Sequence, residues 1–106
     1  MDDQYAFLSG LVAADFPAGI EVLGDVADET DAVFAVIGDI LDELQLARDR
    51  IVKVEVHLSD LDDFDAMDAA YRRFFDGDAY PARTTTESRQ LFGGSKVEIT
   101  CQVRRQ

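Results

Sequence analysis

Apolar residues recur at helical spacing in two segments of the chain. In the first, apolar side chains lie three or four residues apart up to residue 46, which predicts a long amphipathic helix capped by Asp28 or Thr30. A second run follows Asp60 and predicts a shorter helix that ends at Gly77-Asp78. The two core-facing stripes are Val33, Ile37, Ile40, Leu41 and Leu44 in the first helix and Phe64, Met67, Ala70, Tyr71, Phe74 and Phe75 in the second.

Apolar and polar residues alternate elsewhere, which predicts strands. The segment 51–58 has the clearest alternation: Val52, Val54, Val56 and Leu58 are assigned to one face, and Lys53, Glu55 and His57 to the other. Residues 5–8 predict a short first strand that ends at Ser9-Gly10, and 11–24 predict a loop with room for a second short strand.

Two more strands are predicted near the C-terminus, over 83–89 and 96–103. We expect the Gly93-Gly94 turn to join them as a hairpin that brings Arg83 and Glu98 near each other. An arginine fork binds a carboxylate through two parallel hydrogen bonds, and a half-buried glutamate can hold or activate a water. Such a pair suits a small acid that is attacked by water.

The predicted order of strands and helices is typical of an α+β sandwich, in which two helices pack on one face of a small mixed sheet. The other face of that sheet carries mixed polar residues, which indicates burial against a second subunit. No repeat, linker or low-complexity tract divides residues 1–106, so we expect a single domain.

Composition narrows the classes of partner. The chain has 22 acidic and 10 basic residues and a net charge of −12, which disfavours nucleic acid because a phosphate backbone repels such a surface. No apolar run approaches the roughly 20 residues that span a bilayer, so no membrane segment is expected. Cys101 is the single cysteine and the first residues are acidic, so neither a disulfide nor a secretory signal is indicated. We therefore expect a cytoplasmic protein.

Other candidate groups have simpler explanations. Glu55 and His57 lie two apart and suggest an acid–base pair, but a hydrogen-bonded histidine at an interface explains them as well. Cys101 alternates with apolar residues and is expected in the core. The aspartates of 60–68 lack the glycine and terminal glutamate of a calcium loop and suit a helix N-terminus instead. No metal site and no cofactor site are predicted.

Five segments follow one another in a distinctive order and spacing: Ser9-Gly10, the run 51–64, the Tyr71-Arg72-Arg73-Phe74-Phe75 motif, Pro81-Ala82-Arg83 and Val97-Glu98-Ile99. Together they resemble the RidA/YjgF family of reactive-intermediate deaminases over nearly the whole chain. The resemblance implies a chorismate-mutase-like fold assembled as a homotrimer, with ligand sites in clefts between subunits. It also implies hydrolysis of 2-imino or 2-enamino acids to 2-oxo acids and ammonia, without a cofactor.

The resemblance assigns roles to four residues. Arg83 matches the arginine that binds the substrate carboxylate, and Glu98 matches the glutamate associated with the attacking water. Gly10 and Thr85 fall where the family places backbone contacts to the ligand. Without the resemblance, Arg83 is interpreted as a structural arginine paired with a carboxylate, and Glu98 as a strand glutamate that faces solvent or a subunit interface.

The sequence also departs from the family pattern. It begins almost at the first matched strand and lacks the usual N-terminal extension, so we expect a cleft open on one side. Leu11 replaces a glutamine, Asp68 an asparagine and Phe92 a proline. These departures keep open an alternative function, a non-catalytic protein that binds a small carboxylate metabolite as a sensor or regulator. An endoribonuclease, a name often given to this family, is disfavoured by the negative charge.

Overall fold

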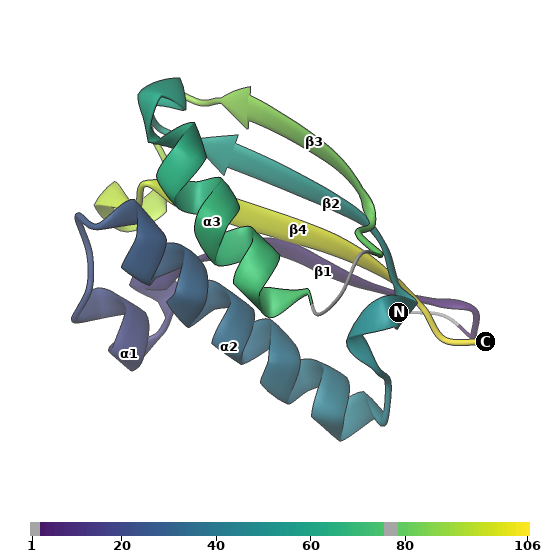
Figure 1. The fold of residues 1–106 in the computed structure, drawn as a ribbon. Helices are drawn as coiled ribbons and strands as arrows, with labels where there is room; N and C mark the ends of the chain where they lie inside the picture. The colour runs from purple at the N-terminus through teal and green to yellow at the C-terminus, as the bar shows by residue number, and fades with distance from the viewer. Residues whose placement is uncertain (1–2, 76–78) are drawn as a thin grey trace.

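A computed structural model of the chain describes residues 3–75 and 79–106. In this part of the chain, four strands form one sheet, and the helices lie against one face of it (Figure 1). The predicted α+β sandwich, with two longer helices on one face of a mixed sheet, is confirmed. The elements are β1 (Tyr5–Val12), α1 (Pro17–Ile20), α2 (Val26–Leu44), β2 (Ile51–Leu58), α3 (Phe64–Phe74), β3 (Ala82–Glu87) and β4 (Val97–Arg104).

The sheet has the order β1-β4-β2-β3, and this order contradicts the predicted hairpin. β4 pairs antiparallel with both β1 and β2, whereas β2 and β3 are parallel neighbours connected through α3. The connection over 88–96 is long enough to carry the chain past β2, and Gly93-Gly94 forms a turn before β4 rather than a hairpin loop. The β3 and β4 strands are therefore separated by β2, because β2 pairs with each of them.

Helix α2 begins earlier than the sequence pattern predicts. Asp25 is its N-cap, and the side chain of Asp25 accepts a hydrogen bond of 3.0 Å from the backbone N–H of Asp28. Thr30, the other predicted cap, is buried inside the helix and donates its hydroxyl to the carbonyl oxygen of Val26 at 2.7 Å. The helix ends at Gln45, whose φ of 59° is left-handed.

Asp60, the expected cap of the second helix, instead caps the 3-10 turn Leu61–Asp63 that leads into α3: its side chain accepts from the backbone N–H of Asp62 at 2.9 Å. The N-cap of α3 itself is Asp63, which makes no side-chain cap hydrogen bond. The helix ends at Phe74, and the predicted stop at Gly77-Asp78 lies outside the described residues. An aromatic cluster joins the two long helices, since the rings of Phe34 and Phe74 stack with their centroids 4.5 Å apart.

The first strand is longer than predicted. β1 continues through Ser9-Gly10 with a shift in register against β4, and Gly10 takes a positive φ of 68° there. In the described structure, short helical turns and α1 follow this strand in place of a second short strand. A bulge of this kind lets the strand pass the irregular position and resume pairing, so the glycine marks a bulge rather than a strand end.

The core lies between the sheet and the helices. The stripes of α2 and α3 pack there against the inward side chains of β2 and β4, including Cys101, where burial raises the pKa of the thiol to about 12. Val52 is the exception among the predicted inward residues of β2, because a register shift next to Ile51 leaves it 39% exposed. Ile51 takes the buried place instead.

One buried carboxylate supports the fold. Glu29 of α2 is fully buried, and its two oxygens accept hydrogen bonds of 2.8 Å from the backbone N–H groups of Gly24 and Lys96. These bonds connect the loop before α2 to the start of β4. A charge-assisted pair of this kind satisfies two backbone donors that would otherwise be buried without a partner.

The second face of the sheet carries no helix of the described structure (Figure 1). Partly exposed Glu98, Thr100 and Gln102 of β4 lie on this open face, beside the outward residues of β2. Phe7 of β1 pairs with Gln102 and is 54% exposed. An aromatic side chain amid polar residues is typical of a surface that contacts another chain.

Candidate functional site

Arg83 lies on β3, an edge strand of the sheet, and its side chain is on the face covered by helices. Its register partner on β2 is the fully buried Val54, and residues paired in this way share a face. The guanidinium of Arg83 sits over the ring of Tyr71 at 4.4 Å and near the ring of Phe64 at 5.3 Å. Two aromatic rings of α3 thus hold the guanidinium of Arg83 in a fixed place.

A carboxylate from α3 also contacts this arginine. Arg83 Nη1 donates to Asp68 Oδ1 at 2.6 Å, and Asp68 Oδ2 accepts from Arg72 Nε at 2.8 Å. The side chains of Arg83 and Asp68 are 20% and 16% exposed, whereas that of Arg72 is 63% exposed. Asp68 therefore bridges a partly buried arginine and a surface arginine.

The charges around Asp68 determine how it ionises. Partial burial alone would raise the pKa of the Asp68 carboxyl, but the hydrogen bonds and positive charges of Arg72 and Arg83 outweigh it and hold the pKa below its usual value. Asp68 is thus an anion at neutral pH. The pKa of Tyr71 is shifted in the opposite direction: burial raises it to about 12 in spite of the nearby Arg83.

These residues surround a hollow of about 260 Å³. Its volume suits a small organic acid rather than a large cofactor. Among the lining residues, two arginines face one aspartate, so the wall has a net positive charge. The lining consists of Asp68, Tyr71, Arg72, Tyr80, Pro81 and Arg83.

Thr85 lies two residues from Arg83 on the same face of β3, where it pairs with Val56 of β2. Its hydroxyl oxygen and that of Tyr71 are buried, and neither has a hydrogen-bond partner within the described residues. A buried hydroxyl without a hydrogen-bond partner is energetically costly. Arg83 and Thr85 thus share one face of β3, and the backbone contact to a ligand that the resemblance implies for Thr85 stays a prediction.

Glu98 and Gly10 are placed elsewhere. Glu98 lies on β4 and pairs with His57 of β2, which puts its side chain on the open face of the sheet. The N–H of Gly10 donates to the hydroxyl of Thr100 at 3.0 Å, on that same face. The prediction that Arg83 and Glu98 lie near each other in a hairpin is wrong, because within one chain they occupy opposite faces.

His57 and Glu55 form no acid–base pair with each other among the interactions of the described residues. The Nδ1 atom of His57 is 2.8 Å from the hydroxyl oxygen of Thr86 on β3, and Glu55 pairs with Lys53 at 3.6 Å. His57 is in register with Glu98 and Thr86, so it lies between a glutamate and a threonine on the open face.

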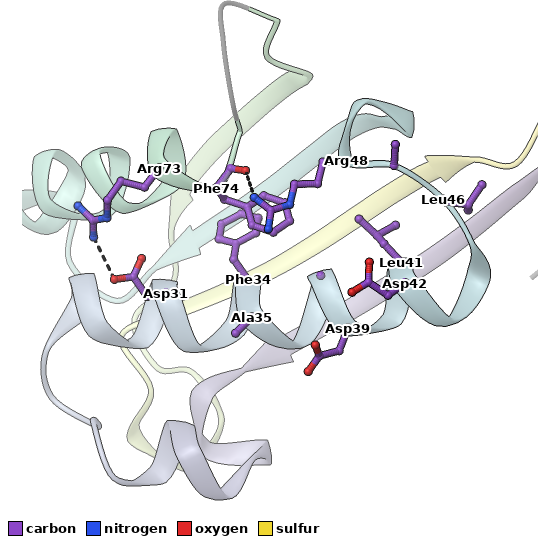
Figure 2. A pocket seen from close by; sticks show the side chains of 12 residues that line it. Asp31, Phe34, Ala35, Asp39, Leu41, Asp42, Leu46, Arg48, Arg73 and Phe74 are labelled. Carbon is purple, nitrogen blue, oxygen red and sulfur yellow. Dashed lines mark hydrogen bonds and ion pairs between the residues drawn. The ribbon is translucent and has the colours of Figure 1, made fainter.

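A larger hollow, of about 470 Å³, lies on the outer side of the helices (Figure 2). Arg73 and Asp31 form an ion pair of 3.0 Å across it, and Arg48 donates to the carbonyl oxygen of Phe74 at 2.7 Å while covering its ring. No residue of the predicted site lines it. Both arginines of this hollow already contact residues of α2 or α3, so its larger volume does not make it the functional site.

Within 3–75 and 79–106, no three His, Cys, Asp or Glu side chains gather as metal ligands would. None of the helices in that part of the chain has both the length and the apolar character needed to cross a bilayer.

Sequence reasoning missed the aromatic part of the site. The sequence pattern predicts Tyr71 in the core stripe of α3, and Tyr71 is buried there, but its ring also contacts the guanidinium of Arg83. Tyr80 lies before Pro81 and lines the same hollow. The spacing of Asp68, Tyr71 and Arg72 places them on one side of the same helix. This spacing indicates a site only once β3, which carries Arg83, is known to lie beside α3.

The chain is similar to proteins of known family. Residues 2–104 match the family model described as Endoribonuclease L-PSP. A RutC family protein of Pyrococcus abyssi is 36% identical over 83% of this chain and 68% of its own length. The human 2-iminobutanoate/2-iminopropanoate deaminase is 31% identical over 92% of this chain and 70% of its own length.

Solved structures share the fold. Escherichia coli TdcF, crystallised with bound serine, has a TM-score of 0.88 and 28% identity, covering 100% of this chain and 85% of its own. The E. coli YjgF gene product has a TM-score of 0.86 and 30% identity, covering 97% and 82%. The match of the family model over almost the whole sequence, together with these relatives, shows that the chain belongs to the RidA/YjgF family.

Proposed function

We propose that the protein hydrolyses reactive 2-imino or 2-enamino acids to 2-oxo acids and ammonia. The observation that carries this proposal is the place of Arg83: a guanidinium held over Tyr71 at 4.4 Å, 20% exposed, in the wall of a hollow sized for a small acid. Relatives named 2-iminobutanoate/2-iminopropanoate deaminase, 31–33% identical to this chain, support the same reaction class.

In the proposed reaction, Arg83 binds the substrate carboxylate and orients the imine carbon. Glu98 accepts a proton from a water molecule as the water oxygen bonds to that carbon. Protonated Glu98 then gives this proton to the nitrogen of the tetrahedral intermediate. The C–N bond breaks and ammonia leaves, while the hydroxyl group loses its proton to Glu98 and becomes the carbonyl of the 2-oxo acid; Glu98 passes that proton to the departing ammonia, which leaves as ammonium. The imine is already electrophilic, so positioning of the substrate and proton transfers through Glu98 account for the catalysis without a cofactor.

The proposal requires two copies of the chain. Arg83 and Glu98 occupy opposite faces of one sheet, so a single chain does not present both to one ligand. We place the open face of one subunit, with Glu98 and Gly10, against the Arg83 hollow of the next, in a closed ring of three. The exposed Phe7 on the open face supports an assembly of this kind.

A coupled assay tests the activity. An amino-acid oxidase generates 2-iminobutyrate in situ, and loss of the imine is followed with and without the protein. We expect wild type to accelerate the loss and Arg83→Ala to lower kcat/KM by roughly ten- to hundredfold, because charge-assisted hydrogen bonds to the carboxylate are lost. Arg73→Ala is the matched control, since Arg73 is an exposed arginine paired with Asp31 outside the hollow. An Arg83→Ala variant as fast as wild type would exclude the proposed role.

A second candidate function is binding without turnover. The placement of Arg83 and Glu98 on opposite faces of the sheet favours it, because the Arg83 hollow of one chain can bind a carboxylate while turnover also needs Glu98. A sensor of this kind would bind 2-oxobutyrate with no effect on imine loss. The wild-type assay and a binding measurement together separate the two functions.

RNA is disfavoured as a substrate in spite of the family model's description. A net charge of −12 repels a phosphate backbone, and RNA cleavage needs the opposite surface. The single cysteine requires no oxidising compartment, which is compatible with the cytoplasmic location we propose.

A further inference from the structure

The wall of the Arg83 hollow contains a chain of three charged side chains. Arg83 donates to one carboxylate oxygen of Asp68, and Arg72 donates to the other. Asp68 is the one carboxylate among the described residues that line this hollow. Its side chain is 16% exposed, so it is less screened by solvent than a surface aspartate.

A ligand bound to Arg83 must share the guanidinium with Asp68. Arginine has five N–H donors, and the Asp68 contact involves Nη1, so other donors of the fork remain for a ligand carboxylate. The carbon next to that carboxylate then lies close to the Asp68 anion, because both groups contact the same guanidinium. A carbonyl oxygen on this carbon presents a partial negative charge to Asp68, whereas a protonated nitrogen presents a positive one.

We propose that Asp68 is a specificity-determining residue that makes the site prefer acids with a protonated nitrogen on the neighbouring carbon over 2-oxo acids of the same skeleton. The inference rests on the proposed function, because it takes Arg83 as the carboxylate-binding group. For a deaminase, the consequence is discrimination between the protonated 2-imino acid that enters and the 2-oxo acid that leaves.

The other lining groups do not supply this discrimination. Burial raises the pKa of Tyr71 to about 12, and the rings of Tyr71 and Tyr80 offer apolar surface that accepts either ligand. Arg72 is positive and mostly exposed, so it favours any anion and repels a protonated nitrogen. Removing the charge of Asp68 should therefore shift the preference toward 2-oxo acids.

The test compares two stable ligands of one carbon skeleton. Dissociation constants of 2-aminobutyrate and 2-oxobutyrate are measured by titration calorimetry or NMR for wild type and Asp68→Asn at neutral pH. The ratio of the two constants is the readout, since release of Arg83 from its ion pair strengthens both ligands alike. We expect the wild-type preference for the amino acid to fall by about tenfold in Asp68→Asn.

Asp65→Asn is the matched control, because it removes the same charge from an exposed position of the same helix, and its ratio should equal that of wild type. Thermal unfolding confirms that each variant is folded. If both ligands bind and the ratio is the same in wild type and Asp68→Asn, the inference is overturned while the proposed function stands. If neither ligand binds wild type, the proposed function fails and the inference fails with it.

Discussion

At the residue scale, Arg83 has three neighbours with different effects on it. Tyr71 and Phe64 present ring faces to the guanidinium, which fixes its position without satisfying its donors. Asp68 satisfies one donor and lowers the net charge of the hollow. The sequence predicts Arg83 as a ligand-binding residue through the motif it belongs to. It also marks Asp68 as an unusual residue, but the contact between the two depends on how α3 lies across β3.

The ion pair of Asp68 predicts a pH dependence of stability. The pKa of Asp68 is lower in the folded chain than its ordinary value of 3.8, so its stabilising effect is complete above that value and is lost as the pH falls through the folded-state pKa. At pH 7, Asp68→Asn should cost about 1 kcal/mol in the free energy of unfolding.

Urea unfolding of wild type and Asp68→Asn from pH 7 down to pH 3 measures this difference. We expect the difference between the two free energies to begin to shrink as the pH falls below 3.8, where Asp68 of the unfolded chain takes up a proton, and to keep shrinking toward the lower pKa of the folded chain. A difference that stays constant over the whole range would contradict the ionic origin of the effect.

At the element scale, local patterns predict the helices and most strand faces, but not which strands are neighbours. The stripe of α3, the alternation of β4 and most of the stripe of α2 are confirmed because each depends only on nearby residues. In α2, Ile40 is only partly buried, and Phe34 is a core residue that the predicted stripe left out. The predicted hairpin fails because a glycine turn marks a change of direction and does not choose a partner. The pairing of β2 with both β3 and β4 decides the order, and it comes from contacts distant in sequence.

The hydrogen bonds of Glu29 lead to a prediction about stability at the scale of elements, because they connect the loop before α2 to the start of β4. Its two oxygens hold backbone N–H groups of Gly24 and Lys96 at 2.8 Å, so Glu29→Gln replaces one acceptor by a donor and leaves a buried N–H unpaired. We expect a loss of about 2 kcal/mol and a fall in Tm of roughly 10 °C. Calorimetry or thermal circular dichroism measures the change.

Glu43→Gln provides the comparison, because Glu43 is an exposed glutamate on the same helix, and its Tm should remain close to that of wild type. If the two variants unfold at the same temperature, the bridging role of Glu29 is wrong.

At the scale of the whole molecule, the four predicted site residues divide into two pairs. Arg83 and Thr85 lie on the helix-covered face at one edge of the sheet, and Gly10 and Glu98 lie on the open face. The sequence predicts all four through its motifs, yet a motif carries no information about which face of a distant strand it will occupy. The division makes sense if copies of the 11.7-kDa chain assemble so that each contributes one pair to a shared site.

Complementation between two inactive variants tests this central claim most directly. Arg83→Ala and Glu98→Gln are each expected to lose most imine deaminase activity, and they are unfolded together at equal amounts and refolded as mixed assemblies. If Arg83 and Glu98 of one site come from different chains, about a quarter of the sites in a random mixture contain both native residues. The account predicts that the mixture recovers about a quarter of wild-type activity. Activity no higher than the average of the two separately refolded variants would contradict it.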